Sequence, residues 1–156
     1  MKKTQTKELS QLKKHIGFWM RIVSNHVSHS FARKLENKAV TVAEWVVLRE
    51  MHECGGAIAP SYIADLTGLS RGAISKLVDR LLDKGFLTRK ESSNDRRYQE
   101  IELTKEAMML LPELASLADE NDMEFFSVLS SGERKTLIQL LKKTAELNQL
   151  TKLPIE

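Results

Sequence analysis

The sequence predicts a mainly α-helical fold with one small β-hairpin near its centre. Apolar residues recur every three or four positions towards both ends of the chain, which is the spacing of amphipathic helices. Residues 86–91 and 97–103 instead have the composition of two strands, and the polar turn "SSND" lies between them. The chain has 156 residues, which is enough to bury a core without disulfides or metals.

The composition, with 42% hydrophobic and 29% charged residues, is typical of a soluble globular protein. Cys54 is the single cysteine, so no intrachain disulfide can form, which fits a reducing cytoplasm. No apolar run approaches the roughly 18 residues of a membrane helix, and the basic N-terminus lacks the apolar stretch of a signal peptide. We therefore expect a cytoplasmic protein without membrane contact. The sequence has no catalytic or phosphate-binding motif, so we expect neither an enzyme nor a cofactor.

The first two helices are expected from their apolar stripes and their capping residues. A single long helix is expected over Leu9–Leu35, where the stripe continues without a break. Thr41 and Glu44 have the spacing of a capping box and begin the second helix, which Gly55 ends.

The next two helices have the spacing of a helix-turn-helix. Ala64 and Gly68 are four residues apart, and Ile74 and Leu77 follow at ten and thirteen residues from Ala64. Ala64 is small enough for the second helix to cross over it, and Gly68 can adopt the turn conformation. Ser70 is a good N-cap for the second helix, which Ile74 and Leu77 anchor to the core.

A helix-turn-helix followed at once by a two-stranded hairpin is a winged helix. Beyond the hairpin, Thr104 is expected to cap a helix that contains Pro112, and Ser130 with Glu133 forms a second capping box. The apolar stripes at both ends need partners, so we expect them to form a dimer interface. The expected regions are an N-terminal dimerisation helix (1–38), a winged helix-turn-helix (39–104) and C-terminal dimerisation helices (105–156).

The second helix and the hairpin tip carry the candidate binding residues. Residues 70–97 hold 8 basic against 4 acidic side chains, a local excess that fits a polyanion. Such a helix fits the major groove of double-stranded DNA, and arginine suits a narrow minor groove beside it. The candidate DNA-binding residues are Ser70, Arg71, Gly72, Ala73, Ser75, Lys76, Arg80, Asn94, Asp95, Arg96 and Arg97. Arg80 could instead pair with Asp79 or Asp83.

The segment "DRRYQEIELT" resembles a signature of the MarR family of transcription regulators, in which Asp95, Arg97, Leu103 and Thr104 occupy the signature positions. The stretches "SRGAISKLVDRLLDKGFLTR" and "TVAEWVVLREM" are also similar to that family. One departure is Ala107, where the family usually has glycine. The resemblance implies an obligate homodimer that represses transcription from a pseudo-palindromic operator and that releases DNA when a small ligand or an oxidant binds.

Several side chains have a second interpretation. Trp19 and Trp45 could line a pocket for a small aromatic ligand, as the family resemblance implies, or could simply pack in the core. Cys54 could sense oxidants, although a small residue at a helix end is the plainer interpretation. His26 and His29 could share a metal, but two ligands do not make a site, so we expect none. The alternative function is a winged-helix module that binds protein and not specific DNA.

Overall fold

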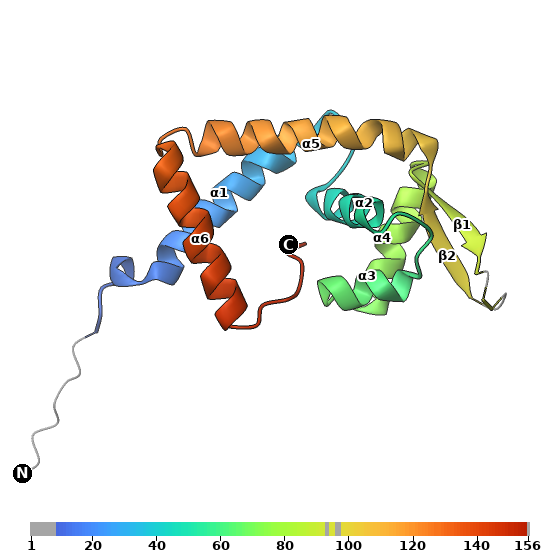
Figure 1. Cartoon of the computed structure of the whole chain (residues 1–156), viewed down its shortest axis with the longest axis horizontal. Helices are drawn as coiled ribbons and strands as arrows, with labels where there is room; N and C mark the ends of the chain where they lie inside the picture. The colour runs from blue at the N-terminus through green and yellow to red at the C-terminus, as the bar shows by residue number, and fades with distance from the viewer. Residues whose placement is uncertain (1–8, 93, 96–97, 156) are drawn as a thin grey trace, which may run out of the picture.

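The computed structural model describes residues 9–92, 94–95 and 98–155, and it confirms a mainly helical fold with a central hairpin. Figure 1 shows the course of the chain. The elements, in order, are a short 3-10 helix η1 (Leu12–Lys14), α1 (Ile16–Glu36), α2 (Val42–Cys54), α3 (Pro60–Thr67), α4 (Arg71–Asp83), β1 (Leu87–Glu91), β2 (Gln99–Leu103), α5 (Lys105–Phe125) and α6 (Ser131–Leu147).

The first helix is shorter than the apolar stripe predicts, because the chain is extended at His15. His15 has φ −88° and ψ 126°, and α1 begins only at Ile16. The Trp19 indole N–H donates to the carbonyl oxygen of Lys13 at 2.9 Å, and the Ser10 hydroxyl lies 3.0 Å from the His15 ring. The expected helix from Leu9 is therefore wrong at its start. Side chain to backbone bonds hold the chain in a separate short turn ahead of α1.

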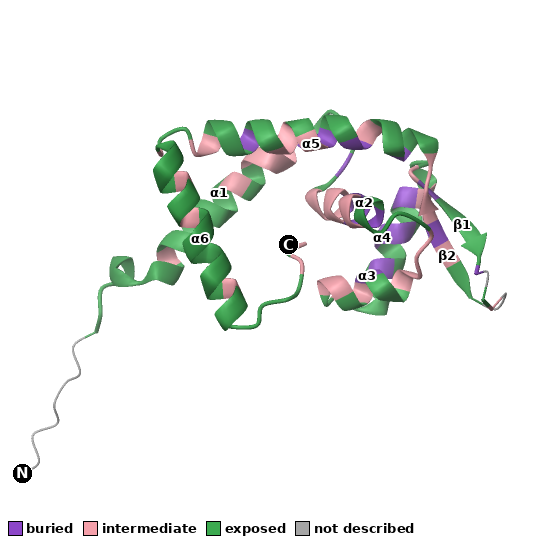
Figure 2. Ribbon diagram, viewed as in Figure 1, coloured by how far each residue is buried: buried purple, intermediate pink, exposed green. Residues whose placement is uncertain are grey.

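We call α1, α5 and α6 the outer helices, and α2, α3, α4, β1 and β2 the winged region. Helix α5 runs from the hairpin across the winged region to the turn before α6 (Figure 1). Most of the buried side chains lie in the winged region and along the adjoining face of α5 (Figure 2). The fully buried residues Leu48, Leu81 and Ile101 come from α2, α4 and β2. Leu35 and Leu114 extend this core to α1 and α5.

Helix α1 packs along α5 through polar bonds as well as apolar contacts. The Asn121 side chain donates to the carbonyl oxygen of Val27 at 3.2 Å. Lys34 donates to Glu124 at 2.7 Å, and this bond raises the pKa of Lys34 and lowers the pKa of Glu124. These bonds fix α5 beside α1 over the second half of α5.

The hairpin is antiparallel, with Leu87 opposite Leu103 and Glu91 opposite Gln99. A third segment joins it, because Ile58 and Ile101 exchange backbone bonds of 2.9 and 2.8 Å. Thr104 then connects the hairpin to α5. Its hydroxyl donates to the carbonyl oxygen of Gly85 at 2.7 Å and accepts from the Ala107 N–H at 3.2 Å.

Both predicted capping boxes are present. At the start of α2, the Glu44 N–H donates to the Thr41 hydroxyl at 3.2 Å, and the Thr41 N–H donates to the Glu44 carboxylate at 2.9 Å. Ser130 and Glu133 exchange equivalent bonds at the start of α6. The backbone bond from Ser130 lowers the pKa of Glu133.

The part of the chain that the structure describes contains no helix with the length and apolar character of a membrane span.

The Glu44 carboxylate is fully buried and forms the centre of the contact between α2 and the end of α4. Lys84 donates to its two oxygens at 2.9 and 2.8 Å, and also to the carbonyl oxygen of Ala39 at 2.7 Å. Arg80 Nε lies 3.8 Å from Glu44 Oε1. A buried carboxylate is tolerated only when its charge is matched and its oxygens are bonded, and here both conditions hold.

Lys84→Met should therefore lower the free energy of unfolding by about 3 kcal/mol, because it leaves a buried charge without its main partner. Lys90→Met is the matched control, since the Lys90 ammonium lies 3.6 Å from Glu102 on the exposed hairpin. The control should change the free energy of unfolding by under about 0.5 kcal/mol. Urea unfolding followed by circular dichroism measures both variants. Equal losses of unfolding free energy in the two variants would contradict a special role for the buried Glu44–Lys84 pair.

Candidate nucleic-acid interface

Helices α3 and α4 form the predicted helix-turn-helix. Gly68 ends α3 with φ +74°, a left-handed conformation that favours glycine, and its N–H donates to the Ala64 carbonyl oxygen at 2.8 Å. Ser70 caps α4, since its hydroxyl accepts from the Ala73 N–H at 3.2 Å. Ile74 and Leu77 are buried and hold α4 against the core. This packing leaves the opposite side of α4 facing outwards.

That outward side carries most of the predicted binding residues. Arg71, Ser75 and Lys76 are exposed. Arg71 and Ser75 are four residues apart and so share one surface of α4. The remaining predicted residues of the helix-turn-helix are also exposed, namely Ser70, Gly72, Ala73 and Arg80.

The ion pairs of α4 differ from the expectation for Arg80. The ion pair that the structure records for Arg80 is with Glu44 on α2, not with its sequence neighbours. Asp79 instead accepts from Arg89 of β1 at 2.9 Å. Adjacent residues on a helix do not face each other, so Asp79 points towards the hairpin while Arg80 points towards α2. The Arg80 side chain is still 58% exposed and remains available to a partner.

Arg89 joins the hairpin to α4, and it is not among the residues predicted from the sequence. Its guanidinium donates to Asp79 of α4 at 2.9 Å and to Gln99 of β2 at 3.3 Å. Arg89 lies opposite the buried Ile101 in the hairpin register. A basic residue two positions after the buried Leu87 is the sequence signal that could have placed Arg89 on the face towards α4.

The hairpin tip is closed by backbone bonds. The Ser92 N–H donates to the Tyr98 carbonyl oxygen, and the Tyr98 N–H donates to the Asp95 carbonyl oxygen, both at 3.0 Å. Asn94 is exposed. The predicted residues Arg96 and Arg97 lie outside the described residues.

A groove of about 540 Å³ runs between the start of α4 and the hairpin tip. Arg71 lines it from α4, and Asn94 and Asp95 line it from the tip. The structure therefore brings predicted residues from two elements, more than 20 positions apart in sequence, to one surface.

The sequence model of the MarR family matches residues 40–97. Solved structures of that family match this chain over almost the whole of their own length. A cysteine mutant of MarR from E. coli complexed with operator DNA is 26% identical with a TM-score of 0.74, and the match covers 86% of this chain and 99% of that one. The chain thus has the winged helix-turn-helix fold of the MarR-type regulators.

Two further structures match this MarR-type chain equally well. A probable transcriptional regulator from Pseudomonas aeruginosa is 25% identical with a TM-score of 0.76, covering 86% of this chain and 99% of that one. BpsR from Bordetella bronchiseptica, described with regulation of its DNA binding by 6-hydroxynicotinic acid, is 21% identical with a TM-score of 0.77. That match covers 88% of this chain and 98% of the other. Ala107, at the family's usual glycine position, is fully buried in the first turn of α5.

The two tryptophans of this MarR-type chain lie in different surroundings. Trp45 is half-buried and packs edge-on against Phe31, with ring centres 6.2 Å apart. Trp19 is 50% exposed and packs edge-on against Phe18 at 5.3 Å. A ligand pocket shared by both tryptophans therefore stays a prediction.

Cys54 and His26, for which a sensing or metal-binding role was the less favoured interpretation, lie on the surface. Cys54 is exposed at the end of α2, and a hydrogen bond with Cys54 raises the pKa of Tyr62. The His26 ring donates to the Ile22 carbonyl oxygen at 2.8 Å. In the described part of the chain, no cluster of three or more histidine, cysteine, aspartate or glutamate side chains could hold a metal ion.

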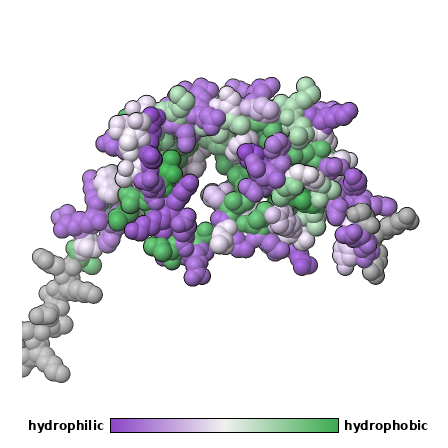
Figure 3. Space-filling model, in the orientation of Figure 1, coloured by the Kyte–Doolittle hydropathy of each residue, from purple (hydrophilic) through white to green (hydrophobic). Residues whose placement is uncertain are grey.

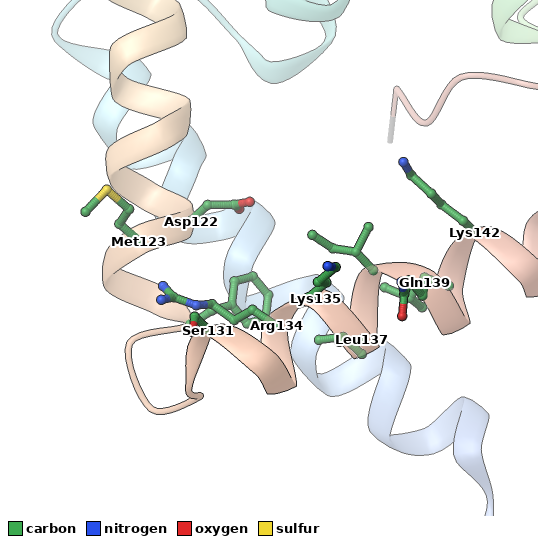
Figure 4. Close-up of a pocket in the computed structure, with 11 residues that line it drawn as sticks. Asp122, Met123, Ser131, Arg134, Lys135, Leu137, Gln139 and Lys142 are labelled. Carbon is green, nitrogen blue, oxygen red and sulfur yellow. The ribbon is translucent and has the colours of Figure 1, made fainter.

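A groove of about 700 Å³ lies between the end of α5 and α6 (Figure 4). Its lining is apolar at Met123, Leu137 and Ile138, while Arg134 and Lys142 also reach it. Several apolar side chains of the outer helices are exposed, namely Ile16 (78%), Met20 (48%), Ile138 (53%), Leu140 (57%), Leu141 (43%) and Leu147 (74%).

Arg89→Ala should loosen the hairpin without unfolding the protein. Both members of the Asp79–Arg89 pair are about half exposed, so the global cost should stay under about 1 kcal/mol. A loss of about 1 kcal/mol in local opening would speed hydrogen exchange of the hairpin amides about fivefold. Lys90→Ala is the control, because its partner Glu102 lies within the hairpin. Hairpin exchange that is equally slow in Arg89→Ala and in the parent would contradict this role.

Proposed function

We propose that this chain is a homodimeric, sequence-specific DNA-binding regulator, a repressor that binds a pseudo-palindromic operator and is released by a small ligand. The observation that carries the proposal is the exposed basic surface of α4 beside the hairpin, in a fold of the MarR type. A structural relative of the same type is known in complex with operator DNA.

The first step is recognition of the major groove by α4. Arg71, Ser75 and Lys76 are exposed on a helix that is anchored from behind by Ile74 and Leu77. Arginine and lysine donate to guanine edges and to phosphates, and serine can donate or accept. An anchored helix presents these groups without a large loss of backbone freedom on binding, which favours specific contacts.

The second step is a minor-groove contact by the hairpin tip. The sequence places Arg96 and Arg97 there, and the described tip residues Asn94 and Asp95 share a groove with α4. We propose that Arg97 enters the minor groove and that Arg96 contacts phosphate. Arg89 holds the hairpin to α4, so both contacts are presented by one connected unit.

Dimerisation is proposed from the outer helices. Apolar side chains gather at the surface around α1 and α6 (Figure 3), and exposed apolar surface of this extent marks an interaction site. Residues 1–38 and 105–156 would form the dimer interface, and residues 39–104 would bind DNA. A two-fold dimer then presents two copies of α4 to two half-sites of an operator.

Ligand control is proposed by likeness to BpsR, whose DNA binding is described as regulated by 6-hydroxynicotinic acid. A small aromatic compound is the class of effector that we propose here. Trp45 and Phe31, which pack together between α1 and α2, provide an aromatic surface at the junction of the outer helices and the winged region.

The DNA-binding proposal predicts that substitutions of two basic residues differ in their effect on operator binding. Lys76→Ala should weaken operator binding and lower the salt slope by about one unit, because a phosphate or base contact is lost. Arg49→Ala is the matched control, since Arg49 pairs with Glu53 on α2, away from α4. Fluorescence anisotropy at several salt concentrations, with DNA selected from a random pool, measures both. Binding by Lys76→Ala that equals that of the control would count against the proposal and favour a protein-binding module.

The dimer proposal predicts that Leu141→Glu produces monomers. Leu141 is 43% exposed on α6, and a carboxylate there would be buried without a partner in an apolar interface. Lys143→Glu is the control, because a residue two positions along a helix faces another direction. Light scattering at micromolar concentration should give twice the chain mass for the parent and for the control. A parent that is stably monomeric would overturn this part of the proposal.

A further inference from the structure

Beyond α6 the chain turns back and reaches the helix-turn-helix. Gln149 has φ +54°, which reverses the chain after the end of α6. The following residues cross from the end of α6 to the end of α3 (Figure 1). We call residues 152–155 the C-terminal strap, since they contact α3 and the core of the winged region.

The strap completes the C-terminal cap of α3. The last carbonyl groups of any helix lack partners within the helix. In α3 these are the carbonyl groups of the last four residues, 64–67, and the Gly68 N–H donates to the first of them, on Ala64, at 2.8 Å. Lys152 Nζ donates to the Asp65 carbonyl oxygen, and the Leu153 N–H donates to the Leu66 carbonyl oxygen at 3.0 Å.

The chemistry of these two bonds suits the end of a helix. The carbonyl end of a helix carries partial negative charge, so the Lys152 ammonium is favoured there. Helix α3 has only eight residues, so the unpaired carbonyl groups of its last turn are a large share of its backbone. The strap therefore supplies bonds that α3 cannot make for itself.

Apolar contacts add to these bonds. The Lys152 methylene groups lie 3.7 Å from the position that a Cβ would take at Gly68, so they cover the turn of the helix-turn-helix. Ile155 packs against the main hydrophobic core, and Leu153 is half-buried. Burial of two branched side chains offsets part of the entropy lost when the strap is ordered.

We propose that Lys152, Leu153 and Ile155 are positioning residues that set the orientation of the helix-turn-helix relative to α6. Residues 37–41 and the junction at Thr104 join the winged region covalently to α1 and α5, and Leu35 and Leu114 pack into its core. The strap adds a separate attachment from the end of α6, and it reaches the winged region at α3, away from the hairpin. An attachment at this distance from the others restricts rotation of the helix-turn-helix about them.

This inference rests on the proposed DNA binding for its effect on affinity. If only one of several orientations of α4 can bind DNA, the apparent dissociation constant rises as the fraction of molecules in that orientation falls. Loss of the strap should spread the orientations of α4. A dimer would then bind its best operator more weakly and discriminate less between half-site spacings.

The test uses the full chain with Leu153→Ala and Ile155→Ala combined, and Thr151→Ala as control, because Thr151 is exposed and lies just before the strap. Spin labels are placed at Asp83→Cys on α4 and Lys143→Cys on α6, in a Cys54→Ser background. Excess unlabelled chain is added so that distances within one chain are measured. Melting temperatures verify that each variant is folded, and Ile155→Val tests rescue by a similar side chain.

The combined variant should broaden the distance distribution between the labels, while Thr151→Ala and Ile155→Val retain the narrow one. Its affinity for the best operator should fall about tenfold if about one tenth of the orientations remain competent, and its preference among half-site spacings should flatten. A folded combined variant with the parent's narrow distribution would overturn the proposal. The distance readout needs no DNA, so a parent that binds no DNA would remove the proposed function and leave the strap supported by its distances.

Discussion

The buried carboxylate of Glu44 is the constraint on which the position of α4 depends. Its oxygens cap α2 and bind Lys84 at the end of α4. A buried charge that loses its partner is costly, so this contact permits one arrangement of α2 against α4 and penalises the others. Lys84 also holds the Ala39 carbonyl oxygen in the link to α1. The Glu44 carboxylate thus connects three helices: α1 through the link that follows it, α2, and α4 with its exposed basic surface.

The second half of α4 is held by two different kinds of interaction. Its last turn is held by the buried Glu44–Lys84 contact, whereas Asp79 is joined to the hairpin through the half-exposed Arg89. Exposed pairs contribute little to global stability but can fix a relative orientation. The position of α4 against α2 is therefore maintained strongly, whereas the hairpin can shift relative to α4 at lower cost.

Local features of the sequence were predictive, and contacts between distant segments were not. Thr41 with Glu44, Ser130 with Glu133, and the Gly68 turn are patterns within a few residues, so they could be read directly. The strand pair and the anchoring of Ile74 and Leu77 follow from periodicity. The pairing of Lys84 with Glu44 spans 40 positions, and that of Arg89 with Asp79 joins two elements, so no local pattern reveals them. The break at His15 depends on side chain to backbone bonds that interrupt an otherwise continuous apolar stripe.

Helix α5 runs without interruption from the hairpin to the turn before α6, and Pro112 lies within it. A helix of 21 residues is about 30 Å long, so a change of about 5° in its tilt moves one end by about 3 Å relative to the other. Proline lacks the N–H that would stiffen the preceding turn, and bending is concentrated at such a residue. Helix α1 is bonded to the part of α5 beyond Pro112, at Asn121 and Glu124, whereas Ala107 and Leu111 ahead of the proline pack into the core of the winged region. Pro112 therefore lies between the part of α5 that belongs to the winged region and the part that belongs to α1.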